Sequence, residues 1–182
     1  MKGKIGLEEH FATPDTIHFS QRFCYPEAWN ELKQRLLDIQ QLRLAEMDKN
    51  GIELMLISLN APAIQAIPDR KAAIEISRRA NDLLAEEIAK NSKRFAGFAA
   101  LPMQEPEAAI AELQRCVKDY NFKGALVNGF TQIDIDDSMV YYDLPQYRPF
   151  WAEVEKLDVP FYLHPRCPAD SQQRAYEGHP WL

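Results

Sequence analysis

The chain has 182 residues, a formal net charge of −6 and a hydrophobic fraction of 46%, which is typical of one globular domain or of part of a larger one. It contains no basic block that could neutralise phosphates, so we expect no nucleic-acid partner. No run approaches the roughly 18 apolar residues of a membrane span, and we expect no membrane association. Three widely spaced cysteines do not form the pattern of a disulfide framework, which predicts a reducing, cytoplasmic setting.

Strand-like and helix-like segments alternate along the chain. A first strand is predicted over residues 4–8, then a loop over 11–27 and a long helix over 29–50 that Gly51 ends. The further segments, in chain order, are a strand at 52–59, a helix after its N-cap Asp69, a strand at 94–101, a helix that begins near Pro106, a strand at 123–128, a helix at 147–157, a strand at 159–163 and a loop over 165–182.

Five strands separated by four helices predict an α/β fold with a parallel sheet. A doubly wound open sheet and a (β/α)8 barrel both fit this order. No glycine-rich G-x-G-x-x-G turn follows the first strand, which argues against a dinucleotide-binding sheet. Since a complete barrel needs about 250 residues, the chain resembles a barrel interrupted after its fifth strand.

Polar side chains stand at the ends of the first and fifth strands. Side chains alternate along a strand, so Glu8 and His10 share one face while Glu9 points to the other. His164 ends the last apolar run, and the carboxyl ends of parallel strands lie at the same rim of a barrel. A carboxylate and two imidazoles are three of the four ligands of a mononuclear metal site. Each residue alone could instead be structural, but their joint occurrence favours a metal site.

Other polar or aromatic residues carry weaker signals. Asn60 and Asn128 could contact a substrate oxygen or cap a turn, and Phe23 could wall an aromatic pocket or simply pack. We interpret His18 and His179 as exposed or structural. No base is placed beside Cys167, and the acidic trio that begins at Asp134 lacks the spacing of a calcium loop.

Four motifs resemble the non-oxidative aromatic-acid decarboxylases of the amidohydrolase superfamily, and the resemblance spans essentially the whole chain. The motifs are Leu7-Glu8-Glu9-His10-Phe11, Ser58-Leu59-Asn60-Ala61-Pro62, Gly124-Ala125-Leu126-Val127-Asn128-Gly129 and Val159-Pro160-Phe161-Tyr162-Leu163-His164-Pro165. The resemblance implies a (β/α)8 TIM barrel that holds one divalent ion, Zn²⁺ or Mn²⁺, with Glu8, His10 and His164 as ligands. It also implies that Asn128 and Phe23 contact the substrate.

The resemblance further implies that this chain is the N-terminal part, residues 1–182, of a single barrel domain. The family's fourth ligand, an aspartate after the eighth strand that is also the expected proton donor, has no counterpart in the chain. We therefore expect no catalytic acid within this segment and expect the proton-donor aspartate to lie beyond Leu182. The family members are expected to act on small aromatic carboxylic acids and to form homo-oligomers, either dimers or tetramers.

The implied reaction is the reversible, metal-dependent decarboxylation of a hydroxybenzoate. Relatives that act on 2,3-dihydroxybenzoate or salicylate tend to carry alanine where this chain has His10, so His10 favours 2,6-dihydroxybenzoate, with resorcinol and CO₂ as products. Two alternatives stay open. A metal-dependent hydrolase could use the same barrel, because fold alone does not determine the reaction. A 182-residue product could also be a non-catalytic binding module.

Overall fold

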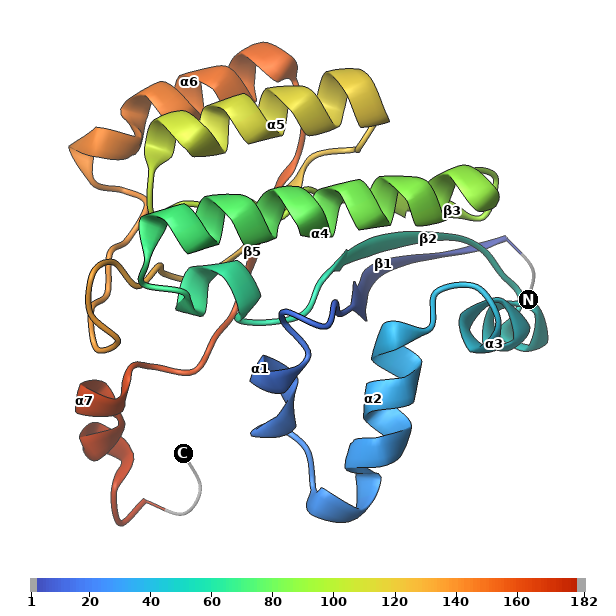
Figure 1. Cartoon of the computed structure of the whole chain (residues 1–182), viewed down its shortest axis with the longest axis horizontal. Helices are drawn as coiled ribbons and strands as arrows, with labels where there is room; N and C mark the ends of the chain where they lie inside the picture. The colour runs from blue at the N-terminus through green and yellow to red at the C-terminus, as the bar shows by residue number, and fades with distance from the viewer. Residues whose placement is uncertain (1–2, 180–182) are drawn as a thin grey trace.

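The computed structural model of the chain describes residues 3–179, and these residues form five strands (Figure 1). The strands are β1 (Lys4–Phe11), β2 (Ile52–Leu59), β3 (Phe95–Gly97), β4 (Ala125–Asn128) and β5 (Phe161–His164). β1 pairs with β2, β2 with β3 and β4 with β5, and every pair is parallel. The N–H of Ala99 donates to Gly124 O at 2.9 Å, which ties the end of β3 to β4. The strands thus follow one another in chain order, and the predicted parallel α/β fold is confirmed.

The described residues form seven α-helices. They are α1 (His18–Gln21), α2 (Trp29–Leu37), α3 (Leu42–Asn50), α4 (Arg70–Lys90), α5 (Pro106–Tyr120), α6 (Arg148–Leu157) and α7 (Asp170–Gln173). Short 3₁₀ turns cover Pro26–Ala28, Ala63–Ala66, Pro145–Tyr147 and Arg174–Tyr176. Helices α4, α5 and α6 form a layer along one side of the strands, whereas α1 and α2 lie beyond the end of β1 (Figure 1). No helix in the described part is long and apolar enough to span a bilayer.

The core lies between the strands and the layer of α4, α5 and α6. Fully buried side chains from both sides contribute to it, among them Ile57, Phe95, Leu84, Leu113 and Phe150. These apolar residues follow the helical and strand periods of the sequence and therefore lie on one face of each element. Their burial removes one contiguous apolar surface from water. This core supports the strands from one side and leaves their carboxyl ends open to the connecting loops.

The predicted single helix over residues 29–50 is wrong. The chain instead forms α2 and α3, because Asp38 has an extended backbone (ψ 117°) and interrupts the helical path. The Asp38 carboxylate accepts the backbone N–H groups of Gln41 and Leu42, both at 2.9 Å, and so satisfies donors at the start of α3. The break lets α2 turn back toward the end of β1, where Ala12 N–H donates to Leu36 O at 2.9 Å.

Three predicted strands are shorter than expected. The segment over residues 94–101 is a strand only over Phe95–Gly97, because the chain then leaves β2 and pairs with β4 through Ala99. The strand predicted at 123–128 begins at Ala125, and the one predicted at 159–163 covers Phe161–His164. The fifth strand begins after Pro160, since proline has no N–H to donate to a neighbouring strand. His164 is therefore the last residue of a strand, not the first of a loop.

Two segments predicted as loops contain short helices. The segment over 11–27 includes α1 and the start of a 3₁₀ turn, and the segment over 165–182 includes α7 and a second 3₁₀ turn. The last three positions of the latter, which end at Leu182, lie outside the described residues. These elements are four residues or fewer, too short for the apolar periodicity that reveals longer helices.

Local capping signals, in contrast, are confirmed. Gly51 ends α3 in the left-handed conformation with φ 68°, and Pro106 occupies the first turn of α5. The Asp69 carboxylate accepts the N–H of Ala72 at 2.7 Å and caps α4.

We expect Asp69→Ala to lower the free energy of unfolding by about 1 kcal/mol, because an orphan donor at the start of α4 loses its acceptor. Urea denaturation of the protein measures this loss. Glu75→Ala is the matched control, because Glu75 is an exposed acidic residue within the same helix. Equal effects of the two substitutions would contradict the capping role.

Candidate metal centre

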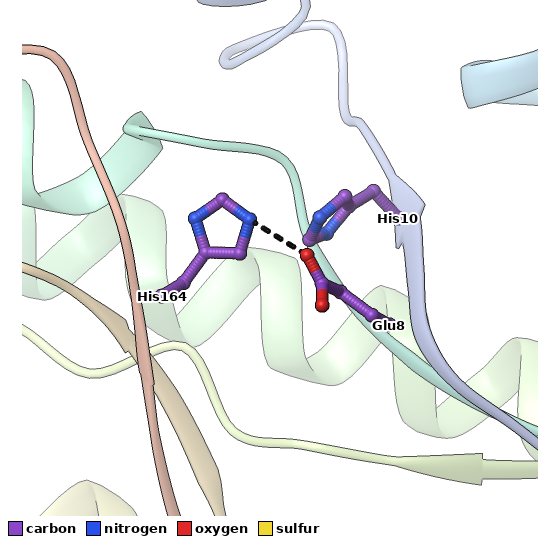
Figure 2. A group of neighbouring side chains, drawn as sticks. All are labelled: Glu8, His10 and His164. Carbon is purple, nitrogen blue, oxygen red and sulfur yellow. Dashed lines mark ion pairs between the residues drawn. The ribbon is translucent and has the colours of Figure 1, made fainter.

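The structure brings together the three residues that the sequence predicts as metal ligands. Glu8 and His10 project from the end of β1, and His164 projects from the end of β5 (Figure 2). One potential ligand atom of each residue lies within 4.8 Å of the other two. Glu8 Oε1 lies 3.3 Å from His164 Nε2, and the two imidazole centroids are 5.1 Å apart. Within residues 3–179, no other group of three acidic, histidine or cysteine side chains is placed to hold a metal.

A β-bulge in β1 contributes to this arrangement. Gly6 pairs with Met55 and Glu9 pairs with Ile57, so β1 has one more residue than β2 between these pairs. Glu8 lies inside this irregular stretch. Bulges often re-aim side chains beside functional sites. The simple alternation that predicts a shared face for Glu8 and His10 therefore describes β1 incompletely, although the two side chains do meet.

Two hydroxyl groups form hydrogen bonds with the candidate ligands. The Tyr162 hydroxyl donates a hydrogen bond to Glu8 Oε2. The Ser58 Oγ lies 3.1 Å from His10 Nδ1. Sequence reasoning missed both residues. A signal was present for Tyr162, since it precedes His164 by two residues and therefore shares its face of β5.

The electrostatics favour the protonation states that bind metals. The hydrogen bond from Tyr162, helped by the nearby histidines, lowers the pKa of Glu8 below its ordinary value. Burial, together with repulsion from His164, lowers the pKa of His10. At neutral pH the site therefore presents a carboxylate and a neutral imidazole. His164 Nδ1 is buried and has no hydrogen-bond partner among the described residues.

The donor set fits a divalent transition-metal ion. One carboxylate oxygen and two imidazole nitrogens are ligands that Zn²⁺ accepts readily, and carboxylate oxygen also suits Mn²⁺. Three protein ligands leave positions for a further ligand or for substrate atoms. The Glu8 side chain is 50% exposed, whereas that of His164 is 14% exposed. The free coordination position therefore lies at the open side of the cluster, next to Glu8.

A largely apolar cavity of about 360 Å³ opens beside the cluster. Its lining includes His10 and His164 together with Phe23 and Leu36. This volume lies in the range of small-molecule sites. The placement of Phe23 is compatible with its predicted contact with the substrate, and that contact stays a prediction.

Asn128, the other predicted substrate contact, does not line this cavity. Its side chain is buried, and its amide donates to Pro62 O at 3.2 Å and to Gln65 Oε1 at 3.1 Å. These bonds tie the end of β4 to the loop after β2. Asn60 plays a similar part, since its amide donates to Thr16 O and to Ser20 Oγ. A direct contact between Asn128 and substrate stays a prediction.

Arg166 adds a positive charge to the cavity wall, and sequence reasoning missed it. Its guanidinium stacks 3.8 Å from the centroid of the Phe130 ring. It donates only to neutral acceptors, namely two backbone carbonyls and the Gln132 amide oxygen. Burial is the largest cause that lowers the pKa of Arg166, to about 10, so the group is still charged at neutral pH. A cation without a carboxylate partner in the described part makes this wall suitable for an anionic ligand.

The remaining sequence candidates are not members of the cluster. His18 and His179 are exposed, which agrees with their interpretation as exposed or structural residues. Asp134 forms an ion pair with Arg70 at 3.3 Å, on the surface. Cys167 is exposed and lies at the wall of the cavity as a free thiol.

Comparison with known proteins decides the family. The sequence model of the amidohydrolase family matches residues 10–178. The chain belongs to the amidohydrolase family. This amidohydrolase chain is 64% identical over 182 residues to the gamma-resorcylate decarboxylase of Rhizobium radiobacter, a match that covers the whole chain and 56% of that relative.

Solved structures agree with this assignment. A 2,6-dihydroxybenzoate decarboxylase in complex with 2,6-dihydroxybenzoate superposes on the amidohydrolase chain with a TM-score of 0.97 at 64% identity, over 100% of this chain and 56% of that one. A dihydroxybenzoic acid decarboxylase from Polaromonas sp. JS666, with bound manganese and the inhibitor 2-nitroresorcinol, gives a TM-score of 0.96 at 59% identity, over 100% and 55%. The chain thus spans about half the length of the relatives that it matches.

Proposed function

We propose that the protein is a metal-dependent carboxy-lyase that removes CO₂ from 2,6-dihydroxybenzoate to give resorcinol. The observation that carries the proposal is the cluster of Glu8, His10 and His164 at the edge of an apolar cavity. The identity of 64% to a gamma-resorcylate decarboxylase supports the choice of substrate. His10 supports the same choice, because the related decarboxylases for 2,3-dihydroxybenzoate and salicylate tend to have alanine there.

In this proposal Glu8, His10 and His164 hold one divalent ion, and the manganese in the Polaromonas relative supports Mn²⁺ over Zn²⁺. When bound, the ion supplies a Lewis-acid centre that orients the carboxylate and an ortho phenolic oxygen of the substrate. Phe23 walls the cavity for the aromatic ring, and Arg166 contributes positive charge that favours an anionic substrate. Asn128 remains a candidate for a contact with the substrate.

The reaction also needs a proton at the ring carbon that carries the carboxyl group. The described residues that line the cavity include no carboxylic acid that could deliver this proton. This fits the expectation that the donor is an aspartate beyond Leu182, a position that itself lies outside the described residues. In this proposal the proton donor is the part of the mechanism that residues 1–182 do not contribute.

The test is direct. We expect the full-length natural protein, incubated with Mn²⁺ and 2,6-dihydroxybenzoate, to release resorcinol, which chromatography measures. Salicylate and 2,3-dihydroxybenzoate serve as matched substrates and should react at least tenfold more slowly. Equal rates on all three acids would contradict the choice of substrate. Cleavage of an ester or amide without any resorcinol would instead establish the hydrolase alternative, in which the metal activates a water molecule.

We further propose that residues 1–182 are the N-terminal part of one (β/α)8 barrel. Within the described residues β1 and β5 each pair on one side only. Their apolar residues Ile5, Leu7 and Leu163 are 58%, 56% and 57% exposed, which is high for residues in strands. The additional strands and helices of a complete barrel would cover these side chains. An intact mass of the natural protein of about twice 21.0 kDa would agree with this proposal, and a mass of 21.0 kDa would contradict it.

We also propose a cytoplasmic homo-oligomer, either a dimer or a tetramer. The three cysteines are all free, which suits a reducing compartment. The oligomer rests on the family resemblance alone. Light scattering of the eluted protein measures its mass in solution, and a monomer would contradict the proposal.

A further inference from the structure

Ser58 stands directly opposite His10 in the structure. The two residues are register partners where β1 and β2 pair. Ser58 is 1% exposed, and its Oγ lies 3.1 Å from His10 Nδ1 and 3.5 Å from the backbone oxygen of Glu9. Water has little access to this hydroxyl, so its hydrogen bonds are made with these two neighbours.

The single proton of a serine hydroxyl determines how these contacts can be made. A backbone carbonyl can only accept, so the 3.5 Å contact with Glu9, at the outer limit of hydrogen-bond length, forms only when Ser58 donates its proton there. In this arrangement the oxygen has only lone pairs to offer His10, and Nδ1 carries the hydrogen of the shorter, 3.1 Å bond. A neutral imidazole has one protonated nitrogen, so His10 Nε2 is left with its lone pair.

The backbone of His10 is fixed as well. The guanidinium of Arg43 donates to His10 O at 2.5 Å. The ring is therefore held by Ser58 at one nitrogen and the main chain by Arg43 at the carbonyl. His164 differs, because its Nδ1 has no partner among the described residues. Selection of the tautomer by a hydroxyl thus applies to His10 and not to His164.

We propose that Ser58 is a positioning residue that keeps His10 in the tautomer protonated on Nδ1, so that Nε2 is free to bind the metal ion. This inference rests on the proposed metal centre and deepens it. Hydrogen bonds from groups behind a ligand commonly change metal affinity by 10–100-fold when they are removed. Ser58 does not touch the metal in this proposal and acts only through His10.

The test combines histidine NMR with metal titration. Long-range ¹H–¹⁵N spectra of the metal-free protein report which nitrogen of each histidine ring is protonated. Assignment by His10→Gln identifies the signals of His10. We expect wild-type His10 to show a proton on Nδ1 and none on Nε2. Ser58→Ala should lose this preference and lower the affinity for Mn²⁺ by about tenfold.

Two further variants separate positioning from structural damage. Ser58→Thr keeps the hydroxyl and should restore both the tautomer and, within about threefold, the affinity. Ser77→Ala removes another buried serine hydroxyl, which donates to Ile74 O within α4, and should change neither. A wild-type His10 protonated on Nε2 would overturn the proposal, even if Ser58→Ala does not fold. So would an unchanged affinity in folded Ser58→Ala.

The two readouts also distinguish this inference from the proposed function. The tautomer is measured without metal, whereas the affinity is measured with it. A wild-type protein that binds no Mn²⁺ but shows Nδ1–H at His10 would refute the metal centre and leave the role of Ser58 in selecting the tautomer intact. If the wild-type protein binds Mn²⁺ but Ser58→Ala leaves the tautomer of His10 unaltered, the metal centre stands and the role of Ser58 is refuted.

Discussion

The protein with His164→Ala is expected to bind Mn²⁺ at least tenfold more weakly than the wild-type protein, which corresponds to about 1.4 kcal/mol of binding free energy. His164 is the only candidate ligand on β5, and its Nε2 lies 3.3 Å from Glu8 Oε1. Its removal leaves a carboxylate and one imidazole, both from β1. The metal ion would then be bound by residues of one strand only. It would lose the ligand that β5 contributes from a distant part of the chain. The measurement is a titration followed by the electron paramagnetic resonance of free Mn²⁺.

The matched control is His18→Ala, because His18 is an exposed histidine outside the cluster, on α1. We expect its affinity to equal that of the wild-type protein. Circular dichroism of both variants verifies that the fold is retained. An unchanged affinity in a folded His164→Ala protein would remove His164 from the site, and an equal loss in both variants would indicate an unspecific effect of histidine removal.

Gly124→Ala is expected to destabilise the protein more than Asp69→Ala does, by about 3 kcal/mol or more. Gly124 precedes β4 with φ 151°, a conformation that residues with a Cβ rarely adopt. An added Cβ would lie 2.1 Å from the backbone oxygen of Pro160. That oxygen accepts the N–H of Ala125 where β4 meets β5, so neither backbone can move without loss of this contact. Urea denaturation gives the free energy of unfolding.

Gly129 provides the control at the other end of the same strand. A Cβ at Gly129 would meet its nearest atom, Arg166 Cγ, at 3.6 Å, which is ordinary van der Waals contact. We expect Gly129→Ala to change the free energy of unfolding by less than about 1 kcal/mol. Since β5 carries His164, Gly124→Ala should also weaken metal binding. A Gly124→Ala protein as stable as Gly129→Ala would show that the two backbones are not held at this distance.

Local sequence patterns were sufficient to predict those features of the structure that depend on neighbouring residues. The caps at Gly51 and Asp69 and the first-turn proline at Pro106 are interactions within one turn, and all three appear as predicted. The same holds for the alternation of strands and helices, because a buried stripe or run is visible in the order of apolar residues. Local patterns failed at Asp38, where the apolar spacing continues but the carboxylate starts a new helix.

The sequence by itself determined the parallel α/β fold and the three residues of the candidate metal centre. Glu8, His10 and His164 could be selected because polar groups at the carboxyl ends of parallel strands converge whatever the details of packing. Only the tertiary structure decided how these residues are supported. The partners Tyr162 and Glu8 are separated by 154 positions, and Ser58 and His10 by 48. Such pairs depend on strand register and on the bulge in β1, which arise from the packing of distant segments and leave no periodic signal in the chain.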